Sequence, residues 1–172
     1  MTATHDSLRS SHREALIEHL LLGEIMKHLW RGDPPAELEI LKPQVDDAGY
    51  DLALEARGVL RHIQLKSSSR DAKTATVNVS VKLAQKPSGC VLWVLFDPST
   101  MALGPFRWLG AEPGLPLPSI AALKVAKHTK GNAQGVKLPR AGLRVVPRRR
   151  FETLRDVGAV VERLFGNGAP AV

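Results

Sequence analysis

Two neighbouring segments that alternate apolar and polar residues, joined at Arg57-Gly58, restrict the fold more than any other feature of the sequence. Alternation with period two is typical of half-buried β-strands, and it extends over residues 50–56 and 59–66. Gly58 suits the tight turn that would join the two strands, so we predict an antiparallel hairpin. The polar face of its second strand consists of His62, Gln64 and Lys66.

The turn determines which residues of the hairpin face each other. If it is centred on Arg57-Gly58, residue 56 pairs with residue 59, and Asp51 stands directly across from Gln64. Lys66 joins the same face because strand side chains alternate with period two. A three-residue turn would shift the register by one and separate these side chains unless a bulge restored it. The predicted site therefore depends on the length of the turn.

The other segments predict a mixed α and β protein with one domain covering residues 1–172. A capping box at Ser11 and Glu14 predicts an apolar helix that begins near His12, ends near Trp30 and lies against a sheet. The continuous apolar run at 90–96 suits a strand buried on both faces. Further expected elements are strands at 37–41, 77–83, 106–109 and 143–146, a short helix at 120–127, a basic loop at 130–140 and a final helix at 152–164.

Positive charge is concentrated in one part of the sequence. There are 24 Lys and Arg against 17 Asp and Glu, and nine of the basic residues lie within residues 124–150, where no acidic residue occurs. Such a segment indicates a polyanionic partner, although a solvated surface would have the same composition. No aromatic residue is interleaved with these cations, so we expect contact with a duplex backbone rather than with stacked single-stranded bases. The predicted contacts are Lys127, Lys130, Lys137 and Arg140.

Cysteine content and hydropathy bear on the compartment. Cys90 is the only cysteine, so it cannot form an internal disulfide, and no apolar run approaches the roughly 20 residues of a membrane span. We therefore expect a cytoplasmic protein without membrane contact. The six histidines lack the spacing of a zinc site, and no Gly-rich phosphate loop is present.

The polar face of the predicted hairpin carries the groups that phosphodiester hydrolysis requires. Asp51 would hold a hard cation such as Mg²⁺, the Gln64 carbonyl would add a neutral ligand, and the backbone carbonyl oxygen of Leu65 would add a third. Lys66 would orient or deprotonate the attacking water and balance the developing negative charge. These residue types in this register indicate a metal-dependent hydrolase.

At these residues the protein resembles the PD-(D/E)XK nuclease superfamily, whose pattern is a helix with an acidic residue, an Asp at the head of a hairpin, and an acidic residue or Gln two positions before a Lys. The matching residues are Glu24, Asp51 and Gln64-Leu65-Lys66, and the resemblance covers about residues 12–96. It implies an α/β fold in which a central mixed β-sheet is flanked by helices, as in restriction endonucleases. It also implies an endonuclease that uses Mg²⁺ or Mn²⁺.

The resemblance assigns catalytic roles to Asp51, Gln64, Lys66 and Glu24, and a metal set of Asp51, Gln64, Leu65 and Glu24. Glu18 is the alternative helix carboxylate, because it lies six residues before Glu24 and only one of them can face the hairpin. The implied partner is nucleic acid, with double-stranded DNA favoured and a homodimer left open. Gln64 favours the alternative of an inactive nuclease-fold protein that binds nucleic acid or a protein partner.

Overall fold

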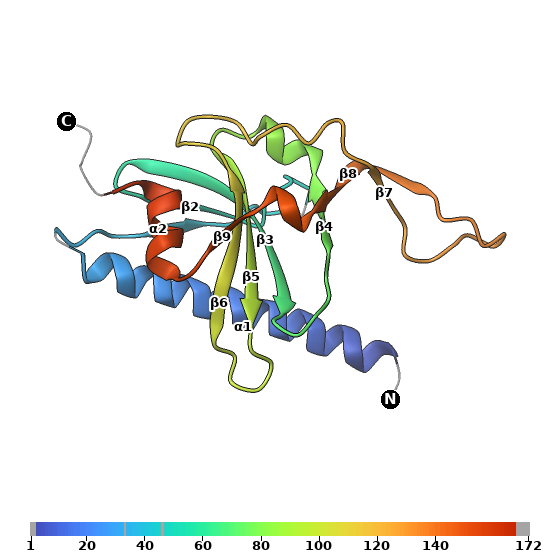
Figure 1. Cartoon of the computed structure of the whole chain (residues 1–172), viewed down its shortest axis with the longest axis horizontal. Coiled ribbons are helices and arrows are strands. Elements are labelled where there is room, and N and C mark those ends of the chain that lie inside the picture. The colour runs from blue at the N-terminus through green and yellow to red at the C-terminus, as the bar shows by residue number, and fades with distance from the viewer. Residues whose placement is uncertain (1–2, 33, 46, 168–172) are drawn as a thin grey trace.

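The computed structural model describes residues 3–32, 34–45 and 47–167 (Figure 1). In sequence order, the elements are α1 (Ala3–Trp30), β1 (Glu39–Leu41), β2 (Leu52–Ala56), β3 (Val59–Ser69), β4 (Thr76–Ser80), the 3₁₀ helix η1 (Val81–Gln85), β5 (Gly89–Phe96), β6 (Leu103–Gly110), β7 (Val125–Lys127), β8 (Pro139–Pro147), the 3₁₀ helix η2 (Arg148–Arg150), β9 (Glu152–Leu154) and α2 (Val157–Phe165). None of the described helices is both long and apolar enough to cross a membrane.

The strands form two sheets. The main sheet has six strands in the order β1-β2-β3-β5-β6-β9, and β4-β8-β7 form a second sheet of three. Strands β3 and β5 are parallel, whereas the other neighbours in the main sheet are antiparallel. The parallel pair requires a crossover connection, and β4 and η1 lie in it. This mixed sheet with helices confirms the predicted fold class.

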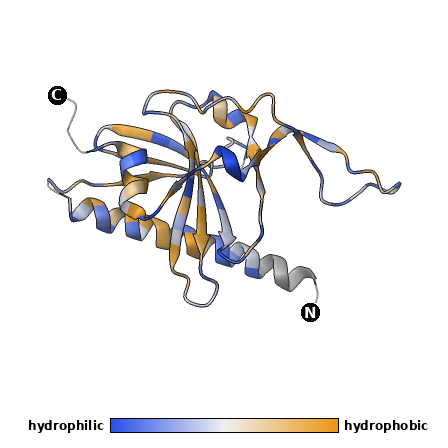
Figure 2. Cartoon of the chain, in the orientation of Figure 1, coloured by the Kyte–Doolittle hydropathy of each residue, from blue (hydrophilic) through white to orange (hydrophobic). Residues whose placement is uncertain are grey.

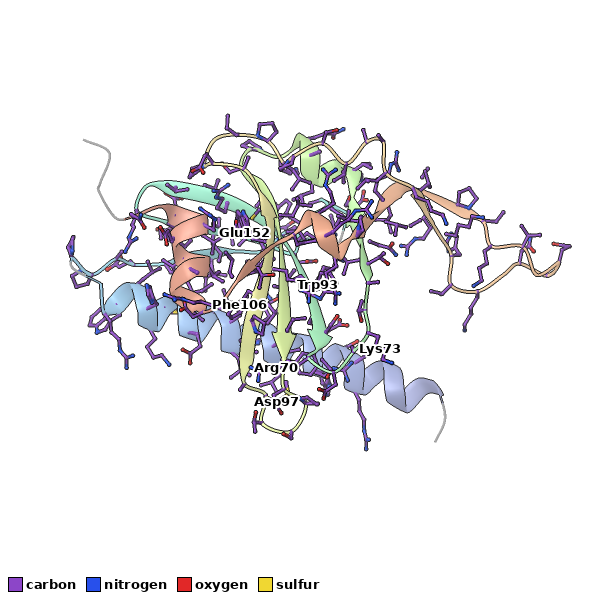
Figure 3. The ribbon with its side chains drawn as sticks, in the orientation of Figure 1. Arg70, Lys73, Trp93, Asp97, Phe106 and Glu152 are labelled. Carbon is purple, nitrogen blue, oxygen red and sulfur yellow. The ribbon has the colours of Figure 1, made fainter. Side chains whose placement is uncertain are left out.

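Strand β5 lies in the centre of the molecule and is buried on both faces, as its continuous apolar sequence predicts. On one face, Leu92 and Val94 belong to a core shared with α1 and α2, while on the other Val91 and Trp93 pack with residues of β4, η1 and β8. Figure 3 labels Trp93 between the main sheet and the second sheet. Figure 2 shows the hydrophobic residues along the strands in the middle of the main sheet.

The turn between β2 and β3 has the predicted length. Arg57 and Gly58 have φ values of 53° and 73°, and two consecutive positive φ values are the conformation of a type I′ hairpin turn. Ala56 consequently pairs with Val59, and Leu52 pairs with Ile63. The predicted register is therefore confirmed.

Two arginines of this hairpin attach it to the end of α2. Arg61 is fully buried and donates to the carbonyl oxygens of Arg163 (2.9 Å), Leu164 (2.8 Å) and Ala111 (2.9 Å), and Arg57 donates to Gly166 (3.0 Å). A cation at the C-terminal carbonyls of a helix is favourable because the helix dipole is negative there. The desolvation of Arg61 lowers its pKa, with the charge partners Cys90 and Glu112 opposing that shift.

The predicted start of the first helix is wrong, because α1 begins at Ala3 rather than near His12. A Ser followed three residues later by Glu has the same spacing inside a helix as at its start. Here Ser10 donates to Glu14 (3.3 Å) within the helix, so this carboxylate makes a contact between successive turns.

Three other predicted elements also differ. The strand predicted at 77–83 ends at Ser80, whose hydroxyl accepts the Lys82 N–H and caps η1. The helix predicted at 120–127 is absent, since Val125–Lys127 pairs with β8 as β7. The final helix begins at Val157 after an Asp156 cap, because Glu152–Leu154 pairs with β6 as β9. In each case, sheet pairing between distant segments or a local cap overrides the apolar periodicity.

Candidate active site

A cleft of about 680 Å³ opens between the start of β2, the middle of β3 and the second sheet. Asp51, Gln64 and Lys66 all line it. The structure thus brings together the three side chains that the hairpin register predicts on one face. Their roles in catalysis or metal binding remain predictions.

Asp51 is held against β3 by its backbone and by its side chain. Its N–H donates to the carbonyl oxygen of Ile63 (2.8 Å), and its Oδ2 accepts the N–H of Leu65 (2.5 Å). The carboxylate therefore takes the place of a backbone acceptor just before β2 begins. The hydrogen bond from the Leu65 N–H thus fixes the direction of the carboxylate.

Gln64 joins the two sheets. The residue is 8% exposed, and its Oε1 accepts the N–H of Ser80 at the end of β4 (3.0 Å). An amide oxygen has two lone pairs, so this bond leaves capacity for one more donor or for a cation. Gln64 thus has a structural role that the sequence alone did not predict.

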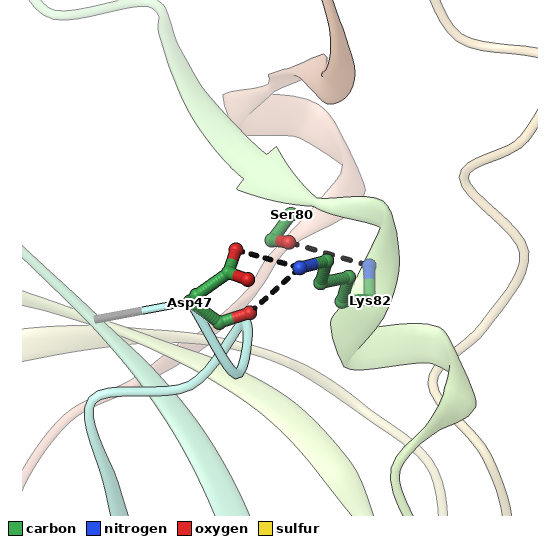
Figure 4. Close-up of polar contacts among 3 residues, drawn as sticks. All are labelled: Asp47, Ser80 and Lys82. Carbon is green, nitrogen blue, oxygen red and sulfur yellow. Dashed lines mark hydrogen bonds and ion pairs between the residues drawn. The ribbon is translucent and has the colours of Figure 1, made fainter. Parts of the chain in front are cut away.

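The loop that leads to Asp51 is attached to η1 (Figure 4). Lys82 donates to the side chain (2.6 Å) and to the carbonyl oxygen (2.9 Å) of Asp47, and this hydrogen bond and the charge of Lys82 lower the pKa of Asp47. Gly49 lies against the same element with φ +82°, and a Cβ there would lie 2.8 Å from the Cβ of Lys82. Close packing at Gly49 and the Lys82 contacts therefore hold the loop against η1.

The other wall of the cleft comes from the basic segment. His128, which follows β7, and Arg140 of β8 both line the cleft. The basic segment lies far from the hairpin in the sequence, and the fold brings the two together at this cleft. Lys82 and His128 were missed because the sequence gives no signal that β4, β7 and β8 form one sheet beside β3.

Glu24 does not lie with the other predicted site residues. It forms an ion pair with Lys27 (2.6 Å) and lines a separate groove between α1 and α2. The alternative, Glu18, forms an ion pair with Lys42, the residue that follows β1. Because Leu41 pairs with Ala53, Lys42 lies near the start of β2, which Asp51 precedes. Neither Glu18 nor Glu24 lines the cleft.

The donors in the cleft are compatible with Mg²⁺. Within the described residues, no group of three or more His, Cys, Asp or Glu could hold a metal. Mg²⁺ is commonly held by one or two carboxylates together with water and substrate phosphates, which suits Asp51 and the Gln64 amide oxygen. The Leu65 N–H donates to Asp51, and in a strand the carbonyl of a residue points to the same side as its N–H. The carbonyl oxygen of Leu65 therefore also points toward the side on which Asp51 lies.

No family model matches the sequence, and no curated protein matches it. Among solved structures, that of a bacterial homing endonuclease, I-Ssp6803I, is similar to 45% of this protein, with 23% sequence identity and a TM-score of 0.25. The match covers 51% of the homing endonuclease, so this protein spans about half its length. We therefore base the functional proposal on the residues of the cleft.

Proposed function

We propose that the protein is a divalent-metal-dependent nuclease that hydrolyses phosphodiester bonds of nucleic acid, with duplex DNA as the preferred substrate. The observation that carries this proposal is the cleft itself. A carboxylate, an amide and an ammonium group from one hairpin share it with Arg140 and His128 of the basic segment. A phosphodiester needs both kinds of group, because its anionic oxygens require cations while its hydrolysis requires a positioned water.

Each side chain has a distinct task in this proposal. Asp51, oriented by the Leu65 N–H, binds the cation, and Gln64 and the Leu65 carbonyl complete the protein ligands. Lys66 holds the attacking water and stabilises the negative charge that develops on phosphate oxygens. Arg140 and His128 contact the substrate from the opposite wall.

A bound Mg²⁺ would supply Lewis acidity to the phosphate and lower the pKa of its water. Mn²⁺ prefers similar oxygen ligands and should replace Mg²⁺. The protein would contribute by holding the substrate next to the bound cation. Because Asp51 is the one carboxylate assigned to the cation, metal affinity should depend strongly on it.

A second candidate function is a binding protein that keeps the cleft without cleaving. The contact that favours it is the hydrogen bond from Ser80 N–H to Gln64 Oε1, since it gives Gln64 a purely structural use. Under this alternative the cleft binds phosphate through Lys66 and Arg140, and affinity does not require a divalent cation.

Metal dependence separates the two candidates. The purified protein is incubated with supercoiled plasmid in Mg²⁺, in Mn²⁺ and in EDTA, and DNA binding is measured in parallel. The nuclease predicts nicked or linear product with either metal and none in EDTA. Binding in EDTA with no product in either metal, at any enzyme concentration tested, would reject the nuclease and leave the binding protein.

A further inference from the structure

The basic segment forms a narrow ribbon that extends from the rim of the cleft. Strands β7 and β8 pair at its base, and we define residues 125–144 as the basic ribbon and residues 129–138 as its tip. Figure 1 shows this ribbon extending away from both sheets. All residues from 127 to 142 are exposed, so the ribbon packs against no other element along its outer half.

Hydrogen bonds order the tip. The N–H of His128 donates to Leu138 (2.9 Å) and that of Asn132 donates to Val136 (2.9 Å), so pairing continues beyond β7. The side-chain oxygen of Asn132 accepts the N–H groups of Gln134 (3.0 Å) and Val136 (2.9 Å) and closes the turn. The tip is therefore preorganised rather than a loose loop.

The tip is also thin. A Cβ at Gly131 would lie 2.6 Å from the backbone of Gly135, so the two sides of the turn at the tip approach more closely than a side chain would permit. The major groove of B-form DNA is about 12 Å wide and admits a two-stranded ribbon, whereas the minor groove is about 6 Å wide. A-form RNA has a deep, narrow major groove that side chains do not read.

The side chains of the tip differ from those of a surface that binds phosphates alone. Lys130 and Lys137 are donors for guanine, and Gln134 can bind adenine through its amide. Val136 and Leu138 are 55% and 52% exposed, and apolar side chains contact the thymine methyl group. The tip thus carries cationic, amide and apolar groups together, with no carboxylate among them.

We propose that the tip of the basic ribbon enters the major groove of duplex DNA and reads base edges, while the cleft at its base holds the phosphodiester. This inference rests on the proposed function for its substrate, and it adds sequence-selective recognition at a second place. Lys130, Gln134 and Lys137 make the base contacts, whereas Arg140 and His128 contact the backbone at the cleft.

The test is a binding selection with the full-length protein in EDTA, so that no cleavage occurs. A pool of duplex DNA with a random central segment is enriched for bound molecules and sequenced. The selected duplex is then prepared with 7-deazapurines, which lack the N7 acceptor in the major groove. The proposal predicts an enriched sequence and an affinity loss of about tenfold or more when contacted purines are replaced.

Variants locate the recognition. The triple variant K130A/Q134A/K137A should lose the preference for the selected duplex and become insensitive to 7-deazapurines. The control K73A/R149A also removes two exposed cations, from outside the ribbon, and should keep both properties. Circular dichroism of both variants verifies that the fold is intact.

Four results would overturn the proposal: no enriched sequence, equal affinity for the 7-deaza duplex, the same preference in the triple variant, or equally tight binding to an RNA duplex. Cleavage of plasmid in Mg²⁺ is measured in parallel, so that failure of base recognition by the ribbon can be distinguished from failure of the nuclease assignment. If the wild type cuts plasmid while its binding ignores base edges, the nuclease stands and the ribbon is a backbone contact.

Discussion

At the scale of single residues, the cleft depends on the backbone groups that its side chains contact. Asp51 accepts from Leu65, and Gln64 accepts from Ser80, so both side chains are oriented by neighbouring strands. A substitution that preserves shape and acceptor capacity should change the chemistry without changing the fold. Gln64 and Asp51 both allow such a substitution.

Gln64→Glu adds a negative charge beside the proposed cation and keeps an oxygen for the Ser80 N–H. We expect Mg²⁺ to bind about tenfold more tightly, which corresponds to about 1.4 kcal/mol. Isothermal titration calorimetry of the wild type and the variant measures this difference, and Gln64→Met serves as a control that removes the oxygen and should weaken binding. Equal affinity in all three proteins would place Gln64 outside the ligands.

Glu24→Gln should leave the rate of plasmid cleavage unchanged, because Glu24 pairs with Lys27 in the groove between α1 and α2. Glu18→Gln, which removes the charge that pairs with Lys42, is measured beside it under single-turnover conditions. A large loss of rate in Glu24→Gln alone would show that the resemblance to PD-(D/E)XK nucleases locates the helix carboxylate better than the described contacts do.

At the scale of elements, the loop before β2 is held by close packing at Gly49. Gly49→Ala should destabilise the protein by about 2–4 kcal/mol, from the positive φ together with the overlap with Lys82. Gly58→Ala is the matched control, because its φ is also positive but a Cβ there meets nothing within 4 Å, and it should cost about 1–2 kcal/mol. Urea denaturation gives both values, and equal losses would contradict the role of packing at Gly49.

Helix α2 should contribute a pH-dependent part of stability. The Asp156 carboxylate accepts the N–H of Ala159 (2.9 Å), and this hydrogen bond is the largest cause of its lowered pKa, followed by the opposing effect of burial and the charge of Arg155. A group with a lowered pKa in the folded state stabilises the protein above its unfolded pKa of about 3.9, and this contribution is lost as pH falls through the folded pKa.

Asp156→Ala should therefore lower the free energy of unfolding by about 1 kcal/mol at pH 7, and the difference from the wild type should shrink below about pH 4. Urea denaturation at a series of pH values measures it. Asp156→Asn keeps a capping oxygen without a titrating charge, so its curve relative to Asp156→Ala should be flat. A difference between the wild type and Asp156→Ala that stays constant down to pH 3 would contradict the contribution of the Asp156 charge to the cap.

The sequence predicted those elements whose structure is determined by residues that are close together in the sequence. The Arg57-Gly58 turn, the alternation of β3 and the apolar run of β5 each specify their structure within a few residues, so the hairpin register was predictable. Strands β7 and β9 were not, because each is a strand through pairing with β8 or β6. The same limit applies to the cleft, since its floor lies in one hairpin but its second wall lies about seventy residues later in the sequence.

At the scale of the whole molecule, the polar face of the hairpin and the basic segment meet in one place. Asp51 comes from the β2–β3 hairpin and Arg140 from the basic segment, yet both line the same cleft. The folded structure therefore places the carboxylate of Asp51 and the guanidinium of Arg140 within one site, as the proposed nuclease requires. This convergence is the central claim, because neither hairpin nor ribbon alone would support nucleic-acid cleavage.

The most direct measurement of that claim is the single-turnover rate of plasmid cleavage in Mg²⁺ for Asp51→Asn and Lys66→Ala, beside Glu55→Gln and Lys73→Ala. Glu55 is an exposed carboxylate on the same hairpin and Lys73 is exposed beyond β3 (Figure 3), and neither lines the cleft. We predict a loss of about 100-fold or more in the first pair, the effect expected when a catalytic group is removed, and no loss in the second. Wild-type rates in Asp51→Asn and Lys66→Ala would contradict the assignment.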